Sequence, residues 1–423
     1  LAPLKYEGLA PWEILVSEAQ ERMTLAVQPD RIERFLDLAR RREVEATVLG
    51  EFTDDGWFQV THGDETVAFI DMEFLHDGAP DLDLTARWSP PRFDEPAGPP
   101  PDDLSQTLLE MLRRLNLCSG ESKARHYDHE VKGLSVVKPF IGVGNDVPSD
   151  ATVFLARHGS PRGFVLSEGI NPFYSDIDAR SMAMSVVDEA VRRQLCAGAR
   201  LDRIALLDNF CWPDPVQSEE TPDGAYKLAQ LVRACRGLHE ACRAYGAPLI
   251  SGKDSMKNES TKGGVKISVP PTLLVSALGR IDDVRDALTL EPRGPGDSVF
   301  LLGLTRDETG GSEYFRYLGE KAGEVEQLGR PRPWVGNKAP NLDPAETVPL
   351  YRAREGAIRE GGVRSATTPV MGGWGPAFAR CVLASGMGLE LDLGGCAALD
   401  DLPAAGARFA ESNGRVLVSV AAD

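Results

Sequence analysis

The stretch "DIDARSMAMSVVDEAVRRQLCAGAR", residues 176–200, carries the strongest secondary-structure signal in the chain. Its apolar side chains recur at the spacing of one helical face: Met182, Val186, Val187, Ala190, Val191 and Leu195. Asp178 is a candidate N-cap, and Gly198 is a candidate terminator. The sequence therefore predicts an amphipathic helix here.

A second stretch, "DGAYKLAQLVRACRGLHEACRAYGAP" at residues 223–248, has the same periodicity and ends at Gly246. Strand-like runs surround the two helices: "RIALLDNF", "PLISG", "VKISV" and "PTLLVSALG". This alternation predicts an α/β fold with α+β layers.

Two breaks divide the 423 residues. The run "WSPPRFDEPAGPPPDD", residues 88–103, contains too much proline for a helix or a central strand and is typical of a semi-rigid linker. The run "LEPRGPGDS", residues 290–298, precedes a strand-like segment. We expect domain boundaries at both.

Composition restricts the possible partners and the location. A formal charge of −18 argues against nucleic acid, which needs a basic face. The seven cysteines form no CxxC pair, so neither a zinc site nor a disulfide framework is indicated, and a reducing cytoplasm is expected. No segment approaches the length of a membrane span.

The segments "SEAQERMTLAV" at 17–27 and "AESNGRVLVSV" at 410–420 can be aligned with each other. Glu18 then matches Glu411, Arg22 matches Arg415, and each segment runs into a strand-like stretch. A chance match is the alternative. If the repeat is real, the chain is cut from a longer protein with two copies of one unit.

The stretch "YGAPLISGKDSMKNES", residues 245–260, is similar to a phosphate-binding loop but lacks its spacing, and Asp254 stands where the hydroxyl belongs. Because Mg²⁺ prefers carboxylate oxygens, Asp254 is a candidate metal ligand; a turn aspartate that accepts its own backbone amides is the alternative. Lys253 would offset phosphate charge or point to water, and Ser255 would bind a phosphate or cap a turn.

Two further carboxylates are candidates to share a metal with Asp254. Asp150 precedes a strand-like segment, and Glu189 lies in the first predicted helix. An ion pair of Glu189 with Arg193, one helical turn later, is the alternative. The glycine pairs in "GGSEYF" (310–315) and "MGGWGPAF" (371–378) permit turns that expose amides to an anion.

Five segments together resemble one family, phosphoribosylformylglycinamidine synthase, within the aminoimidazole ribonucleotide synthase superfamily. They are "GLAPWEILVSEAQERM", "VDEAVRRQLCAGA", "LISGKDSMKN", "ISVPPTLLVSALG" and "GGSEYF". The resemblance implies tandem synthase domains and an internal fragment of a duplicated architecture. The implied parts are the latter part of a first C-terminal-type domain (1–90), a linker (91–103), a second N-terminal-type domain (104–288) and the start of a second C-terminal-type domain (295–423).

The resemblance also implies site residues. Glu18, Ala19, Gln20 and Ser255 would bind formylglycinamide ribonucleotide; Gly252, Lys253 and Ser255 would bind the nucleotide; Asp150, Glu189 and Asp254 would bind Mg²⁺. No catalytic residue is implied.

Two departures from the family pattern stand out. Arg193 replaces a usual Asn four residues after the glutamate, and Thr367 and Thr368 replace the His-Asp of a His-Asp-x-Ser-x-Gly-Gly signature. The first departure removes a usual residue of the family's metal shell, and the second is typical of a degenerate partner half.

The implied activity is the ATP- and Mg²⁺-dependent conversion of formylglycinamide ribonucleotide to formylglycinamidine ribonucleotide in purine biosynthesis. Ammonia would come from glutamine through a glutaminase domain or subunit, because no glutaminase cysteine motif is present. The fragment alone would be inactive. The alternatives are a nucleotide that only braces the domains without turnover, or another ATP-dependent member of the superfamily.

Overall fold

The computed structural model describes residues 4, 7–18, 20–96, 101–127, 129–323, 334–392, 402 and 404–422. It divides into two compact units, Leu1–Asp83 and Leu84–Asp423, which we describe separately. None of the helices in these ranges is both long enough and apolar enough to span a bilayer.

The first unit is small and contains one β-hairpin. Its elements are α1 (Pro11–Leu15), the 3₁₀ turn η1 (Pro29–Arg31), α2 (Ile32–Arg41), β1 (Trp57–His62), β2 (Glu65–Asp71) and α3 (Met72–Asp77). Strands β1 and β2 pair antiparallel, and the rings of Trp57 and Phe69 stack with centroids 4.4 Å apart. This cross-strand pair stabilises the hairpin.

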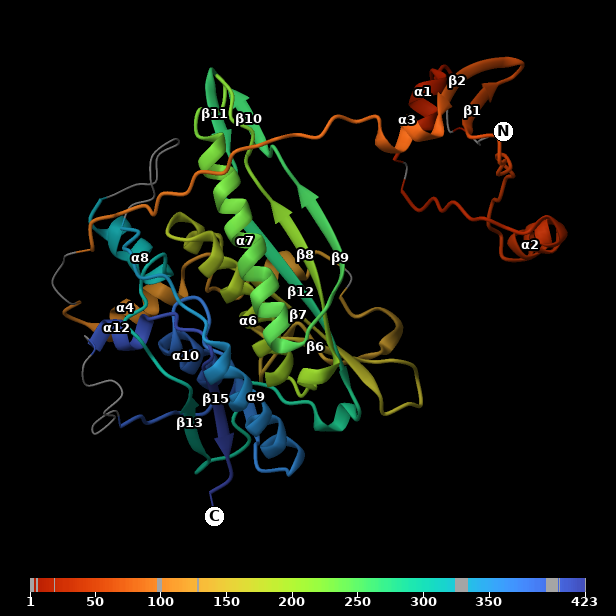
Figure 1. Ribbon diagram of the computed structural model, residues 1–423. Helices are drawn as coiled ribbons and strands as arrows, with labels where there is room; N and C mark the ends of the chain where they lie inside the picture. The colour runs from red at the N-terminus through yellow and green to blue at the C-terminus, as the bar shows by residue number, and fades with distance from the viewer. Residues whose placement is uncertain are drawn as a thin grey trace. The chain divides into compact units, whose positions relative to one another are not determined.

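The second unit is built on a six-stranded sheet with the order β3-β6-β7-β12-β8-β9 (Figure 1). The strands are β3 (Ser135–Val137), β6 (Thr152–Leu155), β7 (Gly163–Ile170), β8 (Ile204–Cys211), β9 (Leu249–Ser255) and β12 (Thr272–Ile281). Neighbouring strands are antiparallel except β8 and β9, which are parallel. Such a pair requires a crossover, which helix α7 provides.

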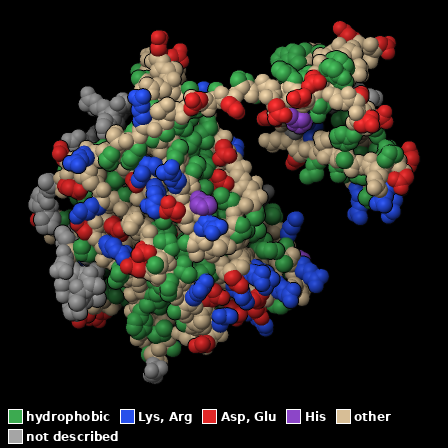
Figure 2. Space-filling view, in the orientation of Figure 1, with side chains coloured by type: hydrophobic (Ala, Val, Ile, Leu, Met, Phe, Trp, Pro, Cys, Tyr) green, Lys and Arg blue, Asp and Glu red, His purple; other side chains and the backbone are tan. Residues whose placement is uncertain are grey.

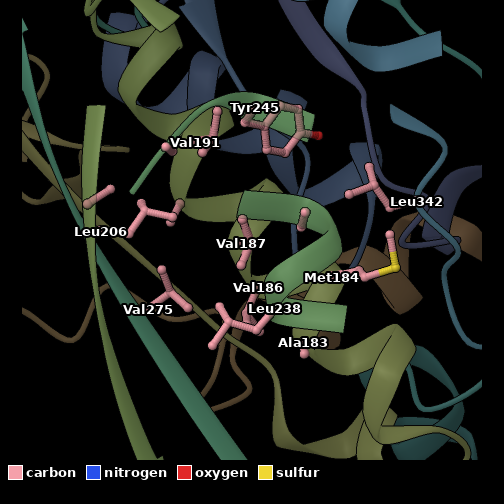
Figure 3. Packing of buried hydrophobic residues seen from close by; sticks show 14 of the residues in the cluster. Ala183, Met184, Val186, Val187, Val191, Leu206, Leu238, Tyr245, Val275 and Leu342 are labelled. Carbon is pink, nitrogen blue, oxygen red and sulfur yellow. The ribbon is translucent and has the colours of Figure 1, made fainter. Parts of the chain in front are cut away.

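The two predicted helices are confirmed as α6 (Ala179–Cys196) and α7 (Gly224–Tyr245). Asp178 caps α6 by accepting from the Arg180 amide, and α7 ends at Gly246, whose φ is +66°. Both helices pack on one face of the sheet, where side chains such as Val187, Leu206 and Leu238 interdigitate (Figure 3). On the other face Leu166 of β7 is 43% exposed.

The prediction that α6 is amphipathic is wrong, because this helix is buried on its polar side as well. Asp188, Glu189 and Arg192 are at most 8% exposed. The polar side contacts elements from the C-terminal part of the chain, so the partners of these charges lie far away in sequence.

Within its described residues, the C-terminal part contributes a three-stranded sheet with the order β13-β15-β14 and four helices. These elements are β13 (Ser298–Leu302), α8 (Glu313–Lys321), α9 (Pro344–Arg359), β14 (Ser365–Thr367), α10 (Trp374–Ser385), α12 (Ala404–Phe409) and β15 (Val416–Val420). The remaining elements of the unit are α4 (Leu104–Leu112), α5 (Glu121–Ala124), β4 (Phe140–Ile141), β5 (Val147–Pro148), β10 (Glu259–Lys262), β11 (Val265–Ser268) and the 3₁₀ turns η2 (Val131–Gly133), η3 (Pro172–Asp176), η4 (Leu201–Arg203) and η5 (Val284–Asp286).

The predicted domains 104–288 and 295–423 share one hydrophobic core. Leu342, Tyr351 and Val416 belong to the same buried cluster as Met184 and Tyr245 (Figure 3 labels Met184, Tyr245 and Leu342). The two parts therefore lie within a single compact unit.

Part of the predicted linker is attached to the second unit. The Trp88 ring stacks on Tyr226 with centroids 5.3 Å apart, and the Arg233 guanidinium lies 4.6 Å from the Trp88 ring centroid. The side chain of Asn337 accepts from the Phe93 amide at 2.9 Å and donates to the Phe93 carbonyl at 2.6 Å. Proline keeps this segment extended, so its free backbone groups are available to Asn337.

Candidate functional site

The Gly-Lys-Asp-Ser motif lies in strand β9, at the edge of the six-stranded sheet, so Asp254 is not the turn aspartate that was the alternative to a metal ligand. The strand continues to Ser255 because β8 pairs with it over that whole length. In this register Gly252 lies opposite Asp208, Lys253 opposite Asn209, and Asp254 opposite Phe210.

Gly252 and Asp254 share the face of β9 that is turned toward α7, because side chains alternate along a strand. A Cβ on Gly252 would lie 2.4 Å from Oδ1 of Asp208, so any side chain here would displace that carboxylate from its position. Burial, and then the negative charge of Asp254, raise the pKa of Asp208. Both carboxylates also raise the pKa of Cys235 on α7, after the larger effect of burial. Because Asp208 lies opposite Gly252, two residues before Asp254, the two carboxylates are neighbours on this face of the strand pair.

Asp208 is not among the ligands predicted from the sequence. Its signal was present in "RIALLDNF", where an Asp-Asn pair interrupts an apolar strand-like run. A carboxylate within such a run, beside a second strand that ends in Gly-Lys-Asp-Ser, is a candidate ligand group.

The opposite face of the same strand pair carries Lys253, Ser255 and Asn209. The Lys253 ammonium donates to the Ser255 hydroxyl. Oδ1 of Asn209 is buried and has no hydrogen-bond partner. A buried oxygen without a donor costs free energy, so this acceptor is suited to a donor from a ligand.

Asp150 and Glu189 lie elsewhere, between the N-terminal and C-terminal parts of the second unit. Asp150 precedes β6 and accepts from the Thr368 amide at 3.2 Å and from Nη2 of Arg380 at 3.1 Å. Glu189 pairs with Nη2 of Arg193 at 2.7 Å. Burial raises the pKa of Glu189, and the charge of Arg193 opposes that rise.

The structure does not bring the three predicted metal ligands together. Glu189 pairs with Arg193 and Asp150 with Arg380, whereas Asp254 lies on β9 beside Asp208 of the neighbouring strand. Within the described ranges no group of three His, Cys, Asp or Glu side chains is placed to hold a metal ion. Asp208 and Asp254 offer the hard oxygen ligands that suit Mg²⁺. Asp150 and Glu189 do not fit a metal, because each already has a guanidinium partner.

The predicted substrate contacts Glu18 and Gln20 lie in the first unit, where both are exposed. Ala19 lies outside the described residues. The matching Glu411 of the repeat has a different environment, since it is 3% exposed and accepts from the amides of Gly372 at 2.7 Å and Glu313 at 3.0 Å and from the Tyr174 hydroxyl.

The glycine-rich turns of "GGSEYF" and "MGGWGPAF" therefore do direct amides, those of Glu313 and Gly372, toward an anion. That anion is the Glu411 carboxylate of the same chain. Burial raises the pKa of Glu411 to about 7, and its hydrogen bonds with Tyr174 and the two amides oppose the rise.

Comparison with known proteins agrees with this architecture. Residues 149–281 match the AIR synthase related protein, N-terminal domain, and residues 2–63 and 294–423 match the AIR synthase related protein, C-terminal domain. Among curated relatives, phosphoribosylformylglycinamidine synthase subunit PurL of Thermomicrobium roseum is 34% identical, covering 100% of this chain and 54% of the relative. The PurL subunit of Alkaliphilus metalliredigens is 31% identical, covering 92% of this chain and 49% of the relative.

Solved structures of PurL from Thermotoga maritima share the fold. The complex with FGAR superposes with a TM-score of 0.61 at 21% identity, covering 99% of this chain and 54% of that chain. The complex with ATP gives a TM-score of 0.57 at 22% identity, covering 99% and 55%. The chain thus spans about half the length of the relatives it matches, and it belongs to the AIR synthase related family, with phosphoribosylformylglycinamidine synthase subunits among its relatives.

Proposed function

We propose that this chain forms part of an ATP-dependent ligase that converts formylglycinamide ribonucleotide to formylglycinamidine ribonucleotide, and that the β8–β9 edge is its nucleotide site. The observation that carries the proposal is the close approach of Gly252 to the Asp208 carboxylate in a strand pair that also presents Asp254, Lys253 and Ser255. PurL neighbours in complex with ATP, ADP and FGAR support the choice of ligands.

The two faces of β9 have separate roles in this proposal. Asp208 and Asp254 on the face toward α7 would hold Mg²⁺, which when bound offsets the charge that spreads over the phosphoryl oxygens during transfer. The ammonium of Lys253 would lie against the phosphates, and the Ser255 hydroxyl would donate to the nucleotide or to the substrate. The absence of a side chain at Gly252 leaves space for the Asp208 carboxylate beside the proposed ion.

In the reaction, the amide oxygen of the substrate accepts the γ-phosphoryl group, and ammonia then displaces phosphate. We include Glu18, Ala19 and Gln20 in the proposal as substrate contacts, on the basis of the family resemblance. The ammonia source would be a glutaminase partner, and a Thermotoga maritima neighbour named PurLQS supports such an assembly. A cytoplasmic location agrees with the free state of the six cysteines in the described residues.

The test measures the affinity of the purified chain for ATP with Mg²⁺ by calorimetric titration. Asp208→Asn and Asp254→Asn should each weaken binding about tenfold or more, because each removes one charge from the metal site. Asp286→Asn is the matched control, since Asp286 is an exposed carboxylate in η5, just beyond the opposite end of β12. Unchanged affinity in both site variants would refute the proposed site.

The bracing alternative is tested in the same variants placed in the full-length enzyme. Loss of rate with intact thermal stability supports catalysis at this edge. Loss of folding with Asp254→Asn supports a nucleotide that only braces the domains.

A further inference from the structure

We propose that Arg193 takes the place of a divalent cation between Asp150 and Glu189, so that this cluster between the two parts of the second unit is held together without metal. This inference is independent of the nucleotide site at the β8–β9 edge. It concerns the carboxylates that the family resemblance implied as metal ligands.

Arg193 lies in a buried cluster of charges. The side chains of Asp150, Glu189 and Arg193 are 6%, 10% and 17% exposed. Two carboxylates so poorly hydrated need a cation nearby, because an unpaired charge in such a place is very costly. Arg193 meets that need through two hydrogen bonds to Oε1 of Glu189, at 3.0 Å from Nε and 2.7 Å from Nη2.

Second, Asp150 lies beside the same part of α6, because its carboxylate accepts from the Thr368 amide at 3.2 Å and the Thr368 hydroxyl accepts from Arg192, next to Arg193. Burial alone would lower the pKa of Arg193, but the charges of Glu189, Asp150 and Glu168 raise it above its ordinary value. Arg380, on α10, adds a second cation by donating to Oδ1 of Asp150 at 3.1 Å. A metal ion entering between these carboxylates would meet two guanidinium groups that cannot lose their protons.

The neighbouring Arg192 is not available to either carboxylate as a main partner. Its Nε pairs with Asp188 at 2.6 Å, and its Nη1 donates to the Thr368 hydroxyl at 2.7 Å. Arg193 is therefore the cation on α6 that pairs with Glu189.

Third, two departures from the family pattern, at Arg193 and Thr368, both contact this pair of carboxylates. Arg193 contacts Glu189, and Thr368, which stands where the pattern has Asp, donates its amide to Asp150 at 3.2 Å. A potential ligand oxygen is lost and a permanent positive charge is gained around the same carboxylates. Each change makes the cluster more positive by one charge, so together they supply the two positive charges that a divalent ion would have brought.

The experiment measures thermal unfolding of the full 423-residue chain in EDTA, in Mg²⁺ and in Mn²⁺. All variants carry Asp254→Asn, which silences the proposed edge site. We expect the melting temperature of this parent to be the same in all three solutions. Arg193→Asn should melt lower than the parent in EDTA and gain on the order of 3 °C with saturating Mn²⁺, because it restores a neutral oxygen ligand and leaves two carboxylates for the ion.

Arg180→Asn is the matched control on α6. Arg180 forms an ion pair with Glu240 in which the two side chains are 34% and 44% exposed, so its loss should change the melting temperature little and create no response to metal. Arg193→Lys keeps a cation and should remain insensitive to metal.

Two results would overturn the inference. One is a rise of the parent's melting temperature with Mg²⁺ or Mn²⁺ that disappears with Glu189→Gln, since metal would then bind beside Arg193. The other is a folded Arg193→Asn variant that shows no Mn²⁺ binding by calorimetry. If Arg193→Asn does not fold, the melting temperatures of the parent and of Glu189→Gln, with and without metal, decide whether an ion binds beside Arg193.

Discussion

Replacing Gly252 with alanine tests the geometry of the β8–β9 edge with a single methyl group. The added Cβ would lie 2.4 Å from Oδ1 of Asp208, whereas real Cβ atoms essentially never approach closer than 3.0 Å, so the carboxylate must move by roughly 0.6 Å. A side chain can make that movement by leaving its rotamer at a cost of about 0.5–1.5 kcal/mol. We therefore expect the free energy of unfolding to change by only about 1 kcal/mol.

The effect on nucleotide binding should be larger than the effect on stability. If Asp208 contacts the nucleotide or its metal ion, displacing it removes a charge-assisted interaction worth about 1.5–3 kcal/mol, which corresponds to a loss of affinity of roughly 10- to 150-fold. Calorimetric titration with ATP and Mg²⁺ measures the affinity, and urea unfolding measures the stability. The predicted signature is a large change in the first with a small change in the second.

Gly356→Ala is the control for this variant. Gly356 lies within α9, and an added Cβ would meet no heavy atom within 4 Å. Alanine there should leave ATP binding unchanged and stabilise the helix by up to about 1 kcal/mol. The reasoning fails if Gly252→Ala binds ATP as tightly as the parent, or if both glycine variants weaken binding equally.

Three further predictions concern the interior of the second unit. Asp188→Ala should lower the free energy of unfolding, measured in urea, by about 3–5 kcal/mol, because it leaves Arg192 buried without its carboxylate partner. The same carboxylate accepts from the Tyr351 hydroxyl at 2.5 Å. A loss below about 1 kcal/mol would contradict this prediction. Because the pKa of Glu411 is raised from 4.5 to about 7, the folded state binds this proton more tightly than the unfolded state. The free energy of unfolding should therefore fall by about 3 kcal/mol as pH rises from 4.5 to 7. Glu411→Gln should flatten that part of the stability–pH curve, and an unchanged curve would refute the raised pKa. Gly169→Ala should destabilise far more than Gly252→Ala, since its Cβ would lie 2.0 Å from the Val186 carbonyl oxygen, which is fixed in α6; equal stabilities of the two variants would argue against that packing.

The local elements were predictable because their signals are local. The apolar periodicity of α6, its cap at Asp178 and the stop of α7 at Gly246 each depend on residues within a few turns of one another. The fold class followed from the same alternation of helix and strand patterns. Family resemblance added the tandem domain order, which periodicity alone does not provide.

The errors have one physical cause, which is pairing between residues distant in the chain. The polar side of α6 was expected in solvent, but Asp188 accepts from Tyr245 and from the Gly414 amide, 57 and 226 residues away. Likewise, β9 extends through Asp254 only because β8 is its parallel neighbour. No local pattern encodes such partners.

The prediction of metal ligands illustrates the same limit. Asp150 and Glu189 do lie near each other, and the alternative pairing of Glu189 with Arg193 was visible from their spacing. Asp254 was grouped with them from its residue type and then from the resemblance, whereas in the structure Asp208 lies on the neighbouring strand and its pKa is raised by Asp254. Which carboxylates meet is decided by the register of β8 and β9, and a single sequence does not give that register.

The attachment of residues 88–95 affects where the chain can be shortened. A version of the second unit starting at Leu104 would discard Trp88, which stacks on Tyr226, and the backbone partner of Asn337 at Phe93. It would uncover an aromatic ring and leave an amide without its partner, so poor yield and aggregation are expected. Starting at Leu84 keeps these contacts, and proteases should cut more readily before that residue than within the attached part of the proline run.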